Sequence, residues 1–179
     1  AMLRVLPPSP APPRHGGVLL LDRPERRRFA NLAEVAAALR RAPLSLLGGD
    51  GPLYCEKMTL AAQVASFRGA TAVAAVHGAC LSNALYMPEG ALVVDAVPVK
   101  NFMGAGLVMP LECGVTWFWT LTSNVGVRYW PLLIADGDFD EDTVHVPAAA
   151  LRSALLKGLG PAEGSSLASS PEPLAPASG

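Results

Sequence analysis

Residues 72–88 read AVAAVHGACLSNALYMP, and this stretch decides the fold. Its first five residues are an apolar run typical of a buried strand. His77 follows at the strand exit, and a short helix is predicted to open at Ser82 and Asn83. A strand that stops at small residues and restarts as a helix points backbone N–H groups into one crevice. The stretch therefore predicts an anion site beside His77, with the diphosphate of a nucleotide ligand as its occupant.

The rest of the chain alternates between strand-like and helix-like segments. Strands are predicted at residues 18–21, 43–47, 71–76, 91–97 and 127–134. Helices are predicted after an Asn31 cap, after a Thr59 cap, at 116–124 and at 147–159. Such alternation indicates βαβ units, so the fold class is α/β, with a Rossmann-like parallel sheet and helices on both faces.

In parallel sheets of this kind, ligands bind beyond the carboxyl ends of the strands, near the switch point. The His77 turn and the loop with Arg23, Arg27 and Arg28 both follow predicted strands, so both are expected at that edge. An arginine run is usually a solvated face. However, one desolvated bidentate contact to phosphate contributes about 1.5 to 3 kcal/mol. Of the four arginines in this loop, which include Arg26, one or two are expected to bind phosphate and the others to face solvent.

Composition sets the domain organisation. Residues 1–15 are predicted to be a Pro-rich linker, 16–159 one α/β domain, and 160–179 a disordered tail rich in Pro, Ala, Ser and Gly. The formal net charge of −1 gives no reason to expect a nucleic-acid partner. No apolar run reaches the roughly 18 to 20 residues of a membrane span. The three cysteines, Cys55, Cys80 and Cys113, lack metal-ligand spacing.

Other readings of the motifs are weaker. The turn lacks the G-x-G-x-x-G fingerprint of dinucleotide-binding proteins, which disfavours a dehydrogenase-like protein. Ser82 lacks the G-x-S-x-G elbow of a hydrolase nucleophile. The acidic residues 136–142 do not follow the EF-hand pattern and are read as a solvated turn. His77 alone would more often be structural, and Gly78 and Ala79 alone would allow close packing of strand and helix.

These motifs resemble glycosyltransferase family 61. Residues 77–83, HGACLSN, and residues 87–90, MPEG, are similar to the HGAGLTN and MPPG signature of that family. Arg23 with residues 27–31, RRFAN, is similar to its arginine-rich segment ending in Asn. The resemblance spans roughly residues 19–133. Within it, Cys80 replaces Gly, Ser82 replaces Thr and Asp95 replaces Glu.

The resemblance implies the donor-binding, C-terminal half of a GT-B enzyme in the Golgi or endoplasmic reticulum lumen. Such an enzyme would transfer a sugar with inversion from a UDP-sugar to a protein or glycan acceptor. N-acetylglucosamine or a pentose is the expected sugar. An N-terminal acceptor domain is expected outside this chain. The alternative is a catalytically incomplete nucleotide-binding module.

The expected donor site uses backbone N–H groups, a hydroxyl and guanidinium groups in place of a metal ion. No cofactor is expected, and the general base is unassigned. His77 is the candidate for a catalytic role, donating to a diphosphate oxygen or to the sugar. The residues predicted to bind the donor diphosphate and nucleotide are Arg23, Arg27, Arg28, His77, Gly78, Ala79, Leu81, Ser82 and Asn83.

Overall fold

The computed structural model describes residues 17–49, 51–100, 117–137 and 140–160. Within them lies a five-stranded sheet in the order β3-β1-β4-β5-β6, with every neighbouring pair parallel. The predicted linker at 1–15 lies outside the described residues, as does the predicted tail beyond residue 160. The strands are β1 (Gly17–Leu21), β3 (Ser45–Leu46), β4 (Ala72–Val76), β5 (Leu92–Pro98) and β6 (Arg128–Ile134).

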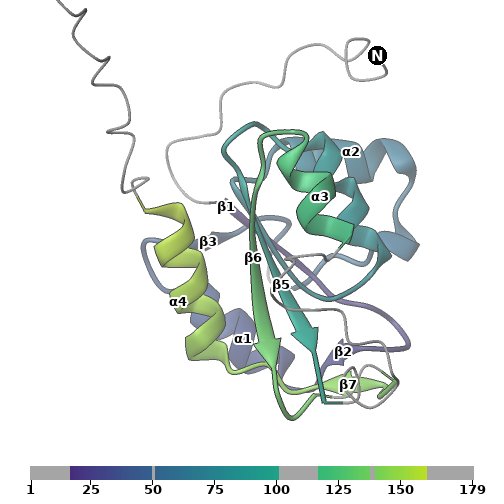
Figure 1. Cartoon of the computed structure of the whole chain (residues 1–179), viewed down its shortest axis with the longest axis vertical. Helices are drawn as coiled ribbons and strands as arrows, with labels where there is room; N and C mark the ends of the chain where they lie inside the picture. Colours follow the sequence, from purple (N-terminus) through teal and green to yellow (C-terminus); the bar gives the residue numbers. More distant parts are fainter. Residues whose placement is uncertain (1–16, 50, 101–116, 138–139, 161–179) are drawn as a thin grey trace, which may run out of the picture.

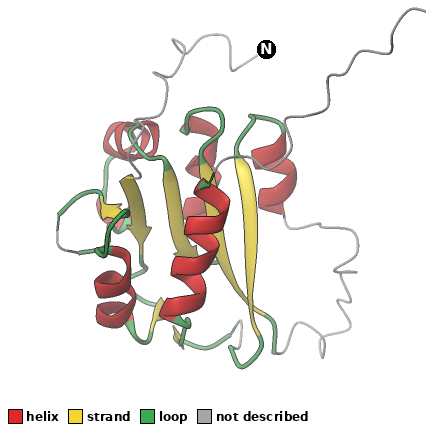
Figure 2. Cartoon of the chain, turned by 90° about the vertical axis from the view of Figure 1, so that its left-hand side faces the viewer, coloured by secondary structure: helices red, strands yellow, loops and turns green. Residues whose placement is uncertain are grey.

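Helices cover both faces of this sheet (Figure 1). Along β1, Val18 and Leu20 pack into a core with α1 (Leu32–Leu39) and α4 (Ala148–Leu159). Figure 2 looks at that face, with α4 crossing in front of the strands. Leu19 and Leu21 point to the opposite core, which is closed by three helices. These are α2 (Leu60–Arg68), the 3₁₀ helix η3 (Ala79–Tyr86) and α3 (Trp117–Ser123). The predicted α/β class is confirmed.

The helix starts show which local predictions hold. The Thr59 side chain accepts a hydrogen bond from the Ala62 N–H at 3.2 Å, so the predicted cap of α2 is confirmed. Asn31 does precede α1, but its side chain makes no capping bond. Its Nδ2 donates to the Val146 carbonyl at 2.9 Å, and its Oδ1 accepts from the Val146 N–H at 3.1 Å. A backbone partner 115 residues away therefore replaces the predicted cap.

The switch point of the sheet lies between β1 and β4. From β1 the chain passes through α1 to β3 on one side, then returns through α2 to β4 on the other side of β1. The two loops that leave the carboxyl ends of β1 and β4 therefore diverge, and in sheets of this kind ligands bind between such loops. A small parallel pair, β2 (Arg28–Phe29) and β7 (Thr143–Val144), lies at the same end of the sheet (Figure 1).

Candidate functional site

Arg23 and Gly78 meet at this switch point. Arg23 comes two residues after β1 and Gly78 two residues after β4. The Arg23 Nη1 atom lies 3.3 Å from the position that a β-carbon on Gly78 would take. It is buried and has no hydrogen-bond partner within the described parts of the chain. The Nε atom lies 3.8 Å from Glu56 Oε1. The guanidinium group thus keeps an unsatisfied donor beside the predicted anion turn.

His77 is fixed on several sides. Its N–H donates to the Ala96 carbonyl at 3.0 Å, which extends the β4–β5 pairing by one residue. Its Nδ1 lies 2.8 Å from Asp95 Oδ2. The Tyr129 hydroxyl donates to the same carboxylate oxygen at 2.6 Å. The imidazole packs edge-on against the Phe118 ring, with 5.1 Å between centroids. The His77 side chain nevertheless keeps 17% of its surface exposed, so it reaches the edge of the site.

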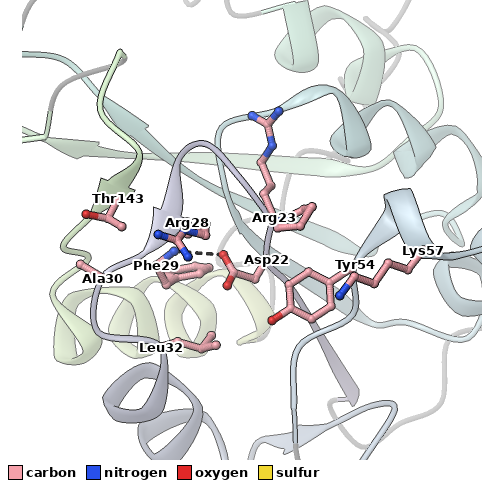
Figure 3. A pocket seen from close by; sticks show the side chains of 10 residues that line it. Asp22, Arg23, Arg28, Phe29, Ala30, Leu32, Tyr54, Lys57 and Thr143 are labelled. Carbon is pink, nitrogen blue, oxygen red and sulfur yellow. Dashed lines mark hydrogen bonds between the residues drawn. The ribbon is translucent and has the colours of Figure 1, made fainter.

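Arg23 also lines a pocket of about 440 Å³ (Figure 3). Asp22 and Arg28 line it from the loop after β1, Tyr54 and Lys57 from the segment before α2, and Thr143 from β7. In Figure 3 the Arg23 guanidinium extends away from Asp22 and the rest of the pocket. Arg23 therefore separates the pocket from the turn after β4.

Asp22 is buried at the base of this pocket. Its Oδ1 accepts a hydrogen bond from the Phe29 N–H at 3.0 Å. Burial raises the pKa of the Asp22 carboxyl above its ordinary value. Backbone hydrogen bonds from Phe29 and Arg23 and the charge of Arg28 act in the opposite direction, and Glu56 raises the pKa further. The net effect favours the protonated carboxyl.

The structure separates the roles of Arg27 and Arg28. Arg27 has a φ of 55°, a left-handed conformation that is uncommon for a residue with a side chain. Its N–H donates to the Glu141 carbonyl at 3.3 Å, so the loop after β1 is tied to the segment before β7. Burial lowers the pKa of the Arg27 guanidinium, helped by the charges of Arg23 and Arg26 and opposed by those of Asp140 and Asp95. Arg28 is exposed and lines the pocket beside Asp22.

The helix after the turn begins earlier than predicted. It starts at Ala79 as a 3₁₀ helix, rather than at Ser82 and Asn83. Ala79 and Ser82 are exposed. The Leu81 side chain is buried in the core and its N–H donates to the Gly78 carbonyl at 3.0 Å. Leu81 therefore supports the turn from inside and offers no free N–H to a ligand.

The Asn83 side chain also bonds to other residues of the protein. Its Nδ2 donates to Gln63 Oε1 at 2.7 Å, and Gln63 Nε2 in turn donates to the Cys55 carbonyl at 3.0 Å. Cys55 forms a disulfide with Cys80, which joins the 3₁₀ helix η2 (Cys55–Lys57) to η3. Cys80, which stands where the family signature has glycine, is therefore cross-linked in this chain. Together the disulfide and the two amides hold η2, α2 and η3 against one another.

The structure brings together Arg23, His77 and Gly78 of the predicted site residues, with Arg27 close enough for its charge to interact with that of Asp95. Sequence reasoning did not assign a role to Asp95, Tyr129 or Tyr54. One signal was present for Asp95, because it is the only charged residue in an otherwise apolar strand, Leu92–Pro98. No comparable pattern marks the two tyrosines. Within the described residues, no group of three or more His, Cys, Asp or Glu is arranged to hold a metal ion.

None of the helices in the described part of the chain has the length and apolar character to cross a bilayer. Among curated proteins, the chain is similar to beta-1,2-xylosyltransferase XYXT1 of Oryza sativa subsp. japonica. It is 28% identical to this chain over 90 residues, which are 50% of this chain and 18% of the relative. The model of the family Glycosyltransferase 61 matches residues 5–94 of the 179 residues. The match contains the arginine loop, the His77 turn and the first strands of the sheet, and the chain therefore belongs to glycosyltransferase family 61.

Proposed function

We propose that this protein is an inverting glycosyltransferase that binds the diphosphate of a UDP-sugar between Arg23 and the turn at residues 77–79. The observation that carries the proposal is the buried Nη1 of Arg23, which lies against Gly78 at the switch point of the sheet and has no hydrogen-bond partner among the described residues. An unsatisfied buried donor is unfavourable, and an anionic ligand would satisfy it with a charge-assisted hydrogen bond.

The proposed mechanism follows from where charge develops. The acceptor hydroxyl oxygen attacks the anomeric carbon from the side opposite the diphosphate, the bond between that carbon and the diphosphate breaks, and the hydroxyl proton passes to a general base, which is unassigned. Negative charge grows on the leaving diphosphate. Preorganised donors aimed at that charge accelerate the reaction, and loss of one typically costs about 2.7 to 4 kcal/mol in other enzymes. Arg23, Arg27, the N–H group of Ala79 and the exposed hydroxyl of Ser82 are assigned this role, with Arg28 toward the pocket. The proposal therefore requires no metal ion.

The proposal also covers the donor sugar, the acceptor and the cellular compartment. The relative's name specifies xylosyl transfer, which supports a pentose donor here, with N-acetylglucosamine as the other sugar considered. The acceptor would be a protein or polysaccharide, held with the help of a preceding domain in a GT-B arrangement. The Cys55–Cys80 disulfide supports residence in the secretory pathway, because disulfides persist in oxidising compartments.

Titration calorimetry with UDP tests the binding site. Arg23→Ala is expected to weaken UDP binding at least about tenfold, which is the loss of one charge-assisted hydrogen bond. Arg26→Ala is the matched control, since Arg26 is an exposed arginine of the same loop. Equal UDP affinity in both variants would remove Arg23 from the site.

A transfer assay with the full-length protein tests the reaction. His77→Ala and Arg28→Ala are each expected to lower turnover at least about tenfold without unfolding the protein. Activity should persist in EDTA. Tight UDP binding without sugar transfer or donor hydrolysis would instead identify a nucleotide-binding module that performs no chemistry.

A further inference from the structure

Asp95 is a charged residue in the interior of the sheet. It lies in β5 between Ala75 of β4 and Pro131 of β6, with none of its surface exposed. Its Oδ2 accepts a hydrogen bond from the Tyr129 hydroxyl and also lies within hydrogen-bond distance of His77 Nδ1. Its Oδ1 is buried without a hydrogen-bond partner in the part of the chain that the structure describes. The carboxylate is therefore only half satisfied.

Stability does not account for this carboxylate. A buried charged group with an unsatisfied oxygen is unfavourable relative to an apolar side chain in the same place. The other residues of β5 are Leu, Val, Ala and Pro, and all of them are buried. Buried polar groups that lack partners call for an explanation, and a catalytic role is one of the known kinds. The groups that face the Asp95 carboxylate are His77 and Tyr129, and the charge of Arg27 also acts on it.

We propose that Asp95 and Tyr129 are positioning residues for His77, and this inference rests on the proposed function. An ionised carboxylate only accepts hydrogen bonds, so His77 Nδ1 is the donor in this contact. In the neutral ring, Nε2 then carries the lone pair. Because Nδ1 faces Asp95, Nε2 lies on the far edge of the ring. The proposal assigns this Nε2 acceptor to a hydroxyl of the sugar or of the acceptor substrate, in place of the donation from His77 that the sequence suggests.

Tyr129 stabilises this arrangement from the neighbouring strand. In the β5–β6 register Tyr129 is opposite Val93, so its side chain stands diagonally to Asp95 on one face of the sheet. Its hydroxyl donates a hydrogen bond to Asp95 Oδ2, the oxygen that His77 also contacts. This bond orients the carboxyl group. Phe118 closes another side of the ring. Each of these contacts limits rotation of the imidazole. The tautomer matters as well, because the opposite one would place an N–H at Nε2, where the proposal needs an acceptor.

The first test measures the tautomer and requires no activity. The ¹⁵N chemical shifts of His77 in the wild-type chain are expected to show a protonated Nδ1 and an unprotonated Nε2 at neutral pH. Asp95→Asn and Tyr129→Phe are expected to increase the share of the opposite tautomer. Tyr86→Phe, which removes another hydroxyl near the same core, should leave the shifts unchanged. A wild-type ring protonated at Nε2 alone would overturn the inference, even if UDP binds as proposed.

The second test is a double-mutant cycle on kcat in the full-length protein. Partners that orient a metal-binding histidine typically contribute about 10- to 100-fold, and a similar factor is expected for His77. Asp95→Asn is expected to lower kcat by about that factor, with a smaller decrease for Tyr129→Phe and little change in UDP affinity for either. In the His77→Ala background, Tyr129→Phe should have no further effect, because both changes act on one unit.

Two outcomes separate failure of this inference from failure of the proposed function. Additive losses for His77→Ala and Tyr129→Phe would show that Tyr129 does not act through His77, while the proposed reaction stands. No transfer activity in the wild type, combined with the expected His77 tautomer, would contradict the reaction and leave the positioning intact. Asp95→Glu tests for rescue, because it keeps the carboxylate that Asp95→Asn removes. Its kcat is expected to lie between those of Asp95→Asn and the wild type.

Discussion

Gly78 leaves room for Arg23. The φ of Gly78 is −179°, an extended conformation that any residue adopts, so backbone freedom does not explain the glycine. Its lack of a side chain does, since a β-carbon would stand 3.3 Å from Arg23 Nη1. That separation is tighter than ordinary van der Waals contact, and the guanidinium group would have to move by a few tenths of an ångström. The position of the arginine therefore depends on the small residue opposite it.

Gly78→Ala is expected to weaken UDP binding while leaving the fold intact. The added methyl group displaces Arg23 from the turn, and a misplaced donor loses much of a charge-assisted hydrogen bond, so a decrease of about three- to tenfold in affinity is expected. Calorimetry with UDP and a thermal melt measure the two quantities. Gly69→Ala is the control, because a β-carbon there would make only ordinary contacts, the nearest at 3.6 Å. UDP affinity equal to that of the wild type in Gly78→Ala would contradict this account of the glycine.

Removal of the Cys55–Cys80 disulfide is expected to destabilise the protein. The bridge closes a loop with a sequence separation of 25, and a disulfide of this kind typically contributes about 2 to 4 kcal/mol to the free energy of unfolding. Cys80→Gly, which restores the residue usual in the family, should therefore lower the denaturant midpoint. A reductant should lower the wild-type midpoint to a similar value and leave Cys80→Gly unchanged. Cys113→Ser should keep the response to reductant. A wild type insensitive to reductant would argue against the bridge.

The α/β architecture could be predicted from the sequence because its signals are local. Apolar runs such as residues 72–76 mark strands that are buried on both faces, and Thr59 marks a helix start without help from the rest of the chain. The approach of Arg23 to the His77 turn also followed from a general rule, since both leave carboxyl ends of parallel strands at a switch point.

The contacts that complete the site could not be predicted in the same way. The pairing of His77 with Asp95 and Tyr129 depends on the register of β4, β5 and β6, which only the assembled sheet defines. The cysteine pair likewise depends on η2 and η3 being packed together. The sequence predicts Leu81 and Asn83 as donor-site residues because they belong to the same motif as His77 and Gly78. Their side chains turn inward because the 3₁₀ helix begins at Ala79.

The contact between Asn31 and Val146, which is present in place of the predicted helix cap, can be tested by substitution. Its amide pairs with both backbone groups of Val146 and so connects the start of α1 to the segment before α4. Asn31→Ala leaves these partly buried groups unpaired, and a loss of about 1 to 3 kcal/mol in the free energy of unfolding is expected. Chemical denaturation measures it. Asn124→Ala is the control, because Asn124, directly after α3, donates an exposed hydrogen bond to the Thr120 carbonyl of that helix. Equal, small losses in the two variants would show that the Val146 contact contributes little.

Asp22→Asn is expected to stabilise the protein at neutral pH. Burial raises the folded-state pKa of Asp22 above 3.8, so the folded protein binds this proton more tightly than the unfolded chain does. The favourable effect of protonation is complete below 3.8 and is lost as the pH rises through the folded-state pKa. The asparagine stays neutral and its Oδ1 still accepts from the Phe29 N–H. The variant should therefore gain stability over the wild type at pH 7, and the gain should shrink as the pH falls toward 3.8. Denaturant unfolding of both proteins across this range measures the difference, and a difference that is constant with pH would contradict the raised pKa.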